Sequence, residues 1–139
     1  MDISLHHKES GTFRINQSNQ PKYLIFATMN TENTSSQMRK GVLEFCILSI
    51  IRRSEVYPSE IIEKMKAAGL QILEGTLYPL LTRLKNAELL SYRWEESASG
   101  PPRKYFSMTE KGEAFYKELE QTWHQLASAV SELTQTTSA

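Results

Sequence analysis

A predicted helix followed by a predicted β-hairpin is the feature that most constrains how this chain can fold. Residues 76–84, Thr-Leu-Tyr-Pro-Leu-Leu-Thr-Arg-Leu, place leucines on one side of a short helix and polar side chains on the other. Residues 90–94 and 104–108 have the composition of strands. Residues 97–102 between them are rich in serine, glycine and proline, which favour turns. The sequence therefore predicts helical structure with a small hairpin.

The helix of this pair is expected to begin at Thr76, whose hydroxyl can accept a hydrogen bond from an unpaired backbone N–H. Pro79 would then lie in the first turn, where a missing N–H costs nothing, and the carbonyl of Gly75 would lie outside the helix. The residues expected to face inward are Leu77, Leu80, Leu81 and Leu84. Those expected to face outward are Tyr78, Thr82, Arg83 and Lys85.

Three further helices complete the predicted order. Residues 38–53 are apolar nearly all round, which indicates a helix buried on more than one side, and we expect its extra face to contact a second subunit. Pro58 opens the next helix at a position that needs no N–H, and Gly69 ends it. A long helix follows Thr109, a predicted N-cap, and runs to about Thr134.

This order predicts an α+β fold, mainly helical with a small β-hairpin: a winged helix-turn-helix with a long C-terminal dimerisation helix. Residues 1–37 show no sustained periodicity and little apolar surface to bury, so we expect a disordered or flexible tail. The winged-helix domain is predicted over residues 38–108 and the dimerisation helix over residues 109–134. Residues 135–139 are expected to form a second tail.

Acidic and basic residues balance over the whole chain, with sixteen of each. Their distribution is uneven, because residues 38–108 hold 11 lysines and arginines against 8 acidic residues, whereas residues 109–139 hold 2 against 5. The excess of positive charge lies with the predicted winged helix, which favours an anionic partner for that domain.

A single cysteine, Cys46, precludes an intrachain disulfide, and we expect a reducing, cytoplasmic environment. Its thiol lies in an apolar run, which favours a buried, inert role over a redox one. The apolar runs fall short of the ~20 residues that span a bilayer. The N-terminus lacks the basic start and apolar stretch of a secretory signal, so we expect no membrane partner.

Signatures of enzymes are missing from the sequence. It has no nucleophile elbow, no phosphate-cradling glycine loop and no HExxH zinc motif. His6, His7, His124 and Cys46 lack the spacing of a zinc site. We therefore predict that the protein is not an enzyme and has no catalytic residue, cofactor or metal.

A polar helix face beside a basic hairpin tip predicts a surface that binds double-stranded DNA. Such a helix can enter the major groove while the hairpin lies on the phosphate backbone. Neighbouring residues of a strand point to opposite faces, so we expect only one of Arg103 and Lys104 to meet DNA directly. The predicted DNA-binding residues are Ser59, Thr76, Tyr78, Pro79, Thr82, Arg83, Arg103 and Lys104.

The C-terminal helix carries an apolar seam whose members recur at alternating spacings of 3 and 4 residues. This spacing is typical of a helix that packs along another helix, and it predicts a homodimer. The predicted interface residues are Phe45 of the first helix together with Tyr116, Leu119, Trp123, Leu126, Val130 and Leu133.

The two motifs together resemble those of the PadR family of winged-helix transcriptional regulators. The resemblance covers residues 38–133 and is carried by residues 76–84 and 100–112, the latter reading Gly-Pro-Pro-Arg-Lys-Tyr-Phe-Ser-Met-Thr-Glu-Lys-Gly. The single C-terminal helix is similar to that of the subgroup with multidrug-sensing repressors. The resemblance implies a homodimeric repressor that is released by a ligand. Two-fold symmetry of such a dimer predicts a pseudo-palindromic operator.

The resemblance also implies where a ligand would bind. In the multidrug-sensing members a tryptophan of the C-terminal helix stacks planar aromatic drugs at the dimer centre, and Trp123 falls at the corresponding place. Those members have an acidic residue one turn later, where this chain has Ala127, which argues against a cationic ligand. A purely structural role for Trp123 in the interface remains open. The implied ligand-binding residues are Met38, Gly41, Val42, Phe45 and Trp123.

Two other functions remain open from the residues alone. Winged helices also serve as protein-docking modules, which would suit a net charge near zero and would require an exposed apolar patch on the third helix. The polar residues Tyr78, Thr82 and Arg83 on that face argue against such a patch. A MarR-type regulator would need dimerisation helices at both ends of the chain, and therefore a folded segment within residues 1–37.

Overall fold

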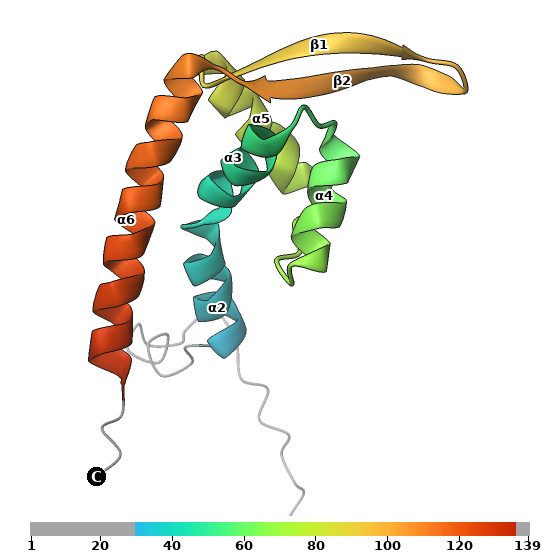
Figure 1. Ribbon diagram of the computed structural model, residues 1–139. Coiled ribbons are helices and arrows are strands. Elements are labelled where there is room, and N and C mark those ends of the chain that lie inside the picture. The colour runs from blue at the N-terminus through green and yellow to red at the C-terminus, as the bar shows by residue number, and fades with distance from the viewer. Residues whose placement is uncertain (1–29, 136–139) are drawn as a thin grey trace, which may run out of the picture. The chain divides into compact units, whose positions relative to one another are not determined.

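The computed structural model describes residues 30–135, which form five helices and one β-hairpin (Figure 1). Residues 36–139 belong to one compact unit, and the arrangement described below is that of its described part. The elements are α2 (Thr31–Lys40), α3 (Leu43–Arg53), α4 (Pro58–Ala67), α5 (Glu74–Asn86), β1 (Leu90–Ser97), β2 (Gly100–Met108) and α6 (Glu110–Thr134). The predicted mainly helical fold with a hairpin and a long C-terminal helix is confirmed. The predictions for residues 1–29 and 136–139 lie outside the described residues.

Helix α2 begins within the segment that was expected to lack structure. Asn30 caps it, because its side-chain Oδ1 accepts the N–H of Glu32 at 2.8 Å. None of its residues is buried. Helical structure therefore starts at Thr31 rather than at Met38, although it adds nothing to the core.

The helix expected over residues 38–53 is divided at Gly41 and Val42 into α2 and α3. The N–H of Val42 donates to the carbonyl of Arg39 at 3.1 Å, an i to i−3 bond in place of the i−4 bond of an α-helix. A glycine inside a helix costs about 1 kcal/mol relative to alanine, which favours the break at this position. The residues that α3 buries in the core are Ile47, Leu48 and Ile51.

Helix α4 begins and ends where the sequence predicts. Pro58 occupies the first turn, and the carboxylate of Glu60 accepts the N–H of Tyr57 at 3.0 Å, which satisfies a donor at the start of the helix. Gly69 follows the end of the helix with φ of 79°. This is the left-handed region, which glycine enters without steric cost.

Helix α5 starts at Glu74, two residues before the expected N-cap Thr76. Leu73 is the N-cap instead, and its carbonyl accepts the N–H of Thr76 at 3.0 Å. Pro79 therefore lies inside the helix and Gly75 belongs to it, contrary to the prediction. The apolar face agrees with the prediction: its buried residues are Leu77, Leu81 and Leu84, with Leu80 partly buried.

The two strands of the hairpin are longer than predicted. Their antiparallel register runs from Leu90 opposite Met108 to Ser97 opposite Gly100, so the turn consists of two residues. Val56, just before α4, forms a bridge on the other side of β2: its N–H donates to Phe106 at 3.2 Å, and the Phe106 N–H donates back at 2.8 Å. Strand β2 is thus tied to the helical part of the fold, and the hairpin projects beyond α4 and α5 (Figure 1).

Thr109 caps α6, as predicted, because its Oγ1 accepts the N–H of Gly112 at 2.9 Å. Gly112 is buried against the start of the hairpin, where a Cβ would lie 2.0 Å from the carbonyl oxygen of Leu89. Only glycine allows this close approach of α6 to the strand. The start of α6 is therefore held firmly against the rest of the fold.

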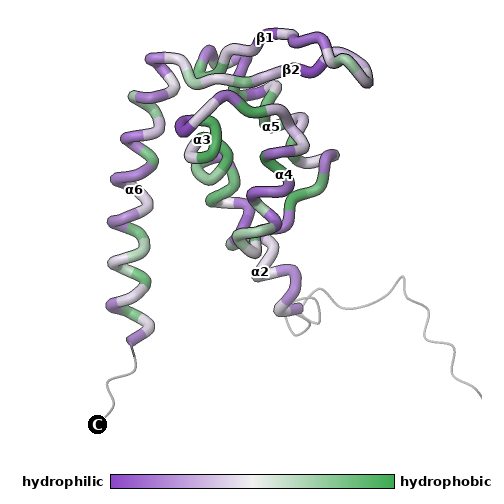
Figure 2. The backbone as a smooth tube through the Cα atoms, turned by 45° about the vertical axis from the view of Figure 1, so that its right-hand side comes forward, coloured by the Kyte–Doolittle hydropathy of each residue, from purple (hydrophilic) through white to green (hydrophobic). Residues whose placement is uncertain are grey.

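The core is formed by residues from α3, α4, α5, the hairpin and the beginning of α6. Phe45 stacks on Tyr116 with ring centroids 5.3 Å apart, which joins α3 to α6. Beyond Tyr116 no residue of the described part of α6 is buried. Figure 2 shows hydrophobic residues gathered on α3 and alternating with hydrophilic ones along α6.

Candidate nucleic-acid interface

A groove of about 430 Å³ lies between the start of α4, helix α5 and the hairpin. It brings together five of the residues predicted from the sequence: Ser59, Tyr78, Thr82, Arg103 and Lys104. The other residues that line it are Tyr57, Pro58, Leu81, Trp94, Pro102 and Phe106. The groove therefore combines hydroxyl groups, two cations and exposed aromatic surface.

Aromatic rings hold the two cations of β2 at the groove. The guanidinium carbon of Arg103 lies 4.7 Å from the ring centre of Tyr57. The Nζ of Lys104 lies 4.2 Å from the ring centre of Tyr92 and 5.1 Å from that of Trp94. In such contacts the electron-rich face of the ring attracts the cation. The two cations contact different rings, as expected for neighbours in a strand, yet both line the groove.

Arg83 lies apart from the groove. Its guanidinium forms an ion pair with the carboxylate of Glu44 on α3, and it is absent from the groove lining. Lys85, the other cation of α5, lies 5.7 Å from the ring centre of Tyr92. The sequence pattern placed Arg83 on the outward face of the helix but gave no sign of its partner on a different helix.

Two other predicted DNA-binding residues also lie outside this groove. Thr76 lines a separate recess with the end of α2 and the segment before α5. Pro79 is exposed on α5. The predicted set is therefore divided: five residues line the groove beside the hairpin, Thr76 and Pro79 lie in the N-terminal half of α5, and Arg83 pairs with Glu44.

Trp94 lines the groove and was not predicted as a site residue. Its side chain is 62% exposed, and it lies opposite Lys104 in the hairpin register. Its ring meets that of Tyr92 edge-on at 6.3 Å. The strand alternation would have found it if the turn had been placed at residues 98 and 99, because Trp94 and Lys104 then face the same side.

Arg93, on the hairpin, is occupied by acidic neighbours. It donates to Glu55 and to Glu95, each at 2.9 Å, and these hydrogen bonds raise the pKa of Arg93. Its guanidinium also lies 5.0 Å from the ring centre of Tyr105. This cation is therefore committed to the fold rather than to the groove.

The residues implied for a ligand site share none of the five main recesses in the described part of a single chain. Met38 on α2 is 73% exposed, and Gly41 and Val42 form the turn before α3. Phe45 packs on Tyr116, whereas Trp123 is 41% exposed on α6 and lines none of the five main recesses.

The residues predicted for a dimer interface fall into two groups. Tyr116 is buried in the core of its own chain, and Phe45 and Leu119 are partly buried against that core. The exposed group lies farther along α6 and consists of Trp123, Leu126, Val130 and Leu133, with the last two 46% and 85% exposed. Every residue of this second group is exposed and can therefore contact a partner.

Cys46 is half-buried, and burial raises the pKa of its thiol, which disfavours a reactive thiolate. Among residues 30–135 the structure contains no cluster of three or more histidine, cysteine, aspartate or glutamate side chains suited to a metal ion. No helix in that range has the length and apolar character needed to cross a membrane.

Residues 47–118 match the model of the transcriptional regulator PadR-like family. A PadR-like transcription factor from Bacteroides fragilis is 55% identical, with 73% of this chain and 99% of that chain covered and a TM-score of 0.62. A PadR-like transcriptional regulator from Bacillus cereus is 40% identical, with 72% and 98% covered and a TM-score of 0.65. A PadR-family regulator from Eggerthella lenta is 31% identical, with 82% and 96% covered and a TM-score of 0.69.

The matched residues 47–118 include every residue that lines the groove. The matches favour the PadR hypothesis over a MarR-type regulator, and members of this family are transcriptional regulators rather than enzymes. The chain belongs to the PadR-like family of transcriptional regulators.

Proposed function

We propose that this protein is a homodimeric repressor that binds a pseudo-palindromic operator. Residues 38–108 act as the DNA-binding domain and residues 109–134 as the dimerisation helix. The observation that carries the proposal is the groove in which two cations of β2 lie beside the polar groups of α4 and α5. This arrangement suits a duplex, because phosphate attracts the cations while hydroxyl groups reach the backbone or base edges.

Helix α5 is the element that enters the major groove in this proposal. Its 13 residues span about 20 Å, and its exposed face carries Tyr78, Pro79 and Thr82. The hairpin then lies on the adjacent backbone with Arg103 and Lys104. Arg83 takes part only if DNA displaces Glu44 from it.

The second half of α6 supports the dimer. This helix has 25 residues and is about 38 Å long, yet only Gly112 and Tyr116 are buried in its own chain. The exposed apolar residues from Trp123 onward can be covered by the same helix of a second subunit. Two-fold symmetry would place the half-sites about 34 Å apart, one turn of the DNA helix.

The ligand that relieves repression is a neutral planar aromatic molecule stacked on Trp123 in this proposal. Met38, Gly41, Val42 and Phe45 complete the site across the dimer, since they share none of the five main recesses with Trp123 in the described part of one chain. Such a ligand weakens operator binding if it prefers a dimer whose DNA-binding domains are spaced differently.

Titration of duplex DNA at several salt concentrations tests the proposal. Binding should weaken steeply with salt, because counterions are released from each neutralised phosphate. Arg103→Ala with Lys104→Ala should make the log–log slope shallower by about 0.9 for each phosphate that is no longer neutralised. Unchanged affinity and slope in that variant would show that the hairpin groove does not bind DNA.

Fluorescence quenching tests the ligand. The chain has two tryptophans, so Trp94→Phe leaves Trp123 as the single reporter. Planar aromatic compounds should quench it in the dimer. Absence of quenching across a chemically varied panel would assign Trp123 to the interface alone.

A further inference from the structure

Two of the arginines near α5 are already paired with acids. Arg83 pairs with Glu44, and Arg93 pairs with Glu55 and Glu95. On the side of α6, Arg52 pairs with Glu113 and Lys111 with Glu88. A cation that is already paired must give up its carboxylate to bind a phosphate, whereas a cation without such a partner loses no ion pair.

The last turn of α2 supplies two such cations. Arg39 and Lys40 are exposed, and no carboxylate among residues 30–135 lies within ion-pair distance of either. They line one recess of about 190 Å³ together with Leu73 and Thr76, at the N-terminal end of α5. The end of α2 and the start of α5 are therefore neighbours on the surface.

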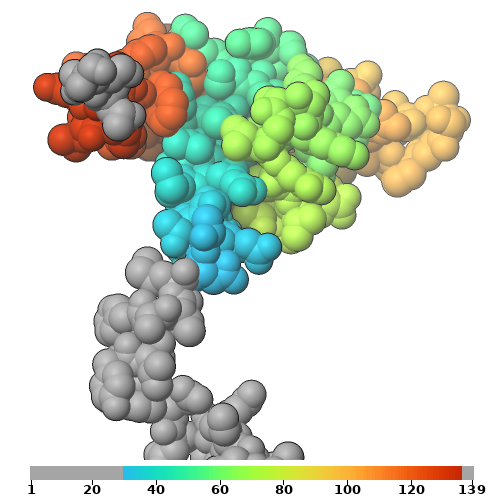
Figure 3. Space-filling view, turned by 90° about the horizontal axis from the view of Figure 1, so that it is seen from below, coloured from blue at the N-terminus to red at the C-terminus, as the bar shows by residue number. Residues whose placement is uncertain are grey.

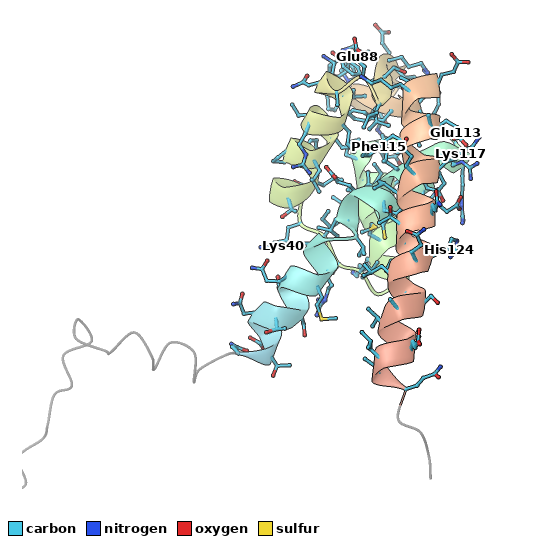
Figure 4. All side chains as sticks on the ribbon, turned by 90° about the vertical axis from the view of Figure 1, so that its left-hand side faces the viewer. Lys40, Glu88, Glu113, Phe115, Lys117 and His124 are labelled. Atoms are coloured by element: carbon cyan, nitrogen blue, oxygen red, sulfur yellow. The ribbon has the colours of Figure 1, made fainter. Side chains whose placement is uncertain are left out.

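This pair lies on the side of the molecule that carries α5. Figure 4 shows Lys40 on the side of α5 and opposite α6, while Lys117 lies on the side of α6. Seen from below, the end of α2 adjoins α5 and is separated from the second half of α6 (Figure 3). The orientation that brings α5 to DNA therefore also brings Arg39 and Lys40 toward it.

We infer that the end of α2 is a second contact with the DNA backbone, across the major groove from the hairpin. The inference rests on the proposed DNA binding and extends it to residues that precede the matched region 47–118. Arg39 and Lys40 neutralise phosphates at the N-terminal end of α5. Lys104 serves the other end, where it shares a recess with Thr82, Lys85 and Asn86.

The dimensions of DNA suit this arrangement. The major groove is about 12 Å wide and α5 is about 20 Å long, so cations at both ends of the helix can reach the phosphates on either side. Phosphate contacts of this kind fix the register of a protein on the duplex without reading its sequence. The end of α2 therefore contributes affinity and orientation to α5.

The test is the salt dependence of binding to random-sequence duplex DNA by the full chain. Arg39→Ala with Lys40→Ala should make the log–log slope shallower by about 1.8 for each subunit on the DNA. The matched control, Arg53→Ala with Lys117→Ala, removes one arginine and one lysine on the side of α3 and α6. It should leave the slope unchanged.

Two additional variants separate charge from folding. Arg39→Lys with Lys40→Arg keeps both charges and should keep the slope, whereas Arg39→Glu with Lys40→Glu should weaken binding further. Circular dichroism and sedimentation establish that each variant keeps its helices and its oligomeric state.

The possible outcomes are distinct. An unchanged slope in Arg39→Ala with Lys40→Ala, alongside a shallower one in the Arg103 and Lys104 variant, would overturn the inference and leave the proposed function standing. Absence of salt-dependent binding by the unaltered chain would overturn the proposed function itself. An equally shallower slope in the control would overturn the inference too, because total charge rather than the end of α2 would then set the slope.

Discussion

The hairpin and the second half of α6 differ in how their exposed side chains are supported. On the hairpin, Arg103 and Lys104 rest on aromatic rings and Arg93 is held by two carboxylates. On α6, Leu126 and Leu133 are 53% and 85% exposed and extend beyond the core. The comparison indicates that one chain by itself forms the groove proposed to bind DNA, whereas the apolar side of α6 beyond Tyr116 is left exposed within the described part of one chain.

This difference separates DNA binding from assembly. Contacts between cations and aromatic rings within one chain reduce the ordering that binding to a phosphate backbone would require. Each apolar side chain that α6 would bury against a partner contributes at most about 1.5–3 kcal/mol, from which the cost of association is subtracted.

The largest effect is expected at Gly112, where α6 joins the hairpin. In Gly112→Ala the new Cβ would lie 2.0 Å from the Leu89 carbonyl oxygen and 2.6 Å from the Met108 sulfur. Backbone must move to relieve these contacts, so the free energy of unfolding should fall by about 3 kcal/mol. Urea unfolding followed by circular dichroism at fixed protein concentration measures the decrease.

Gly75 is the matched control for this substitution. It also lies in a helix, but a Cβ there meets no atom within 4 Å. Gly75→Ala should therefore stabilise the protein by up to about 1 kcal/mol. Equal stability of the two alanine variants would show that α6 is not held at this junction.

The next largest effect is expected for Leu126→Glu, which places a charge in the exposed apolar stretch of α6. If this stretch is covered in a dimer, the charge must lose its water there, and the dissociation constant should rise by about 100-fold or more. Equilibrium sedimentation reads the change, and circular dichroism should show intact helices.

Gln125→Glu adds the same charge at the neighbouring exposed position. It should change the dimer little, because its side chain lies outside the apolar seam. A dimer that tolerates both charges would show that the second half of α6 is not the assembly surface. The exposed apolar residues of α6 would then have another role than assembly.

A smaller effect is expected on the hairpin itself. Trp94→Ala removes one of the two rings near the Lys104 ammonium and leaves Tyr92 at 4.2 Å. An exposed cation–π contact is worth about 0.5–1 kcal/mol, so DNA affinity should fall by about two- to fivefold. Trp94→Phe keeps a ring and should bind like the unaltered chain in anisotropy titrations. Equally weakened binding in both would indicate that the indole contacts DNA by itself.

Local patterns predicted the elements of this fold well where a single residue type decides. Pro58, Gly69 and Thr109 marked helix ends correctly because proline, a left-handed glycine and a capping hydroxyl act through backbone chemistry alone. The predicted start of α5 was wrong, because Leu73 is the N-cap and its apolar side chain forms no capping hydrogen bond that the sequence could indicate.

The site was predictable only in part. Tyr78, Thr82, Arg103 and Lys104 meet in one groove because the hairpin lies beside α5, which their spacing already indicated. The ion pair of Arg83 with Glu44 was not predictable, because Glu44 is 39 residues away and periodicity carries no information about such contacts. The break at Gly41 likewise concealed that Arg39 and Lys40 end a separate helix next to α5.

The smallest expected effect is a pH dependence at the root of α6. The Nε of Arg52 donates to both carboxylate oxygens of Glu113, at 2.8 and 2.9 Å, and this hydrogen bonding lowers the pKa of Glu113 below its ordinary value of about 4.3.

Since the pKa is lower in the folded state, the stabilisation is fully present above about pH 4.3 and is lost as the pH falls through the folded-state value. Glu113→Gln should therefore have a lower melting temperature than the unaltered chain at pH 7 and a nearly equal one at about pH 3. Glu118→Gln, on the same helix and without an ion pair among residues 30–135, is the control. Arg52 and Glu113 are both partly exposed, so solvent screens their ion pair and the effect is small. A difference in melting temperature between Glu113→Gln and the unaltered chain that persisted at about pH 3 would assign Glu113 a packing role instead.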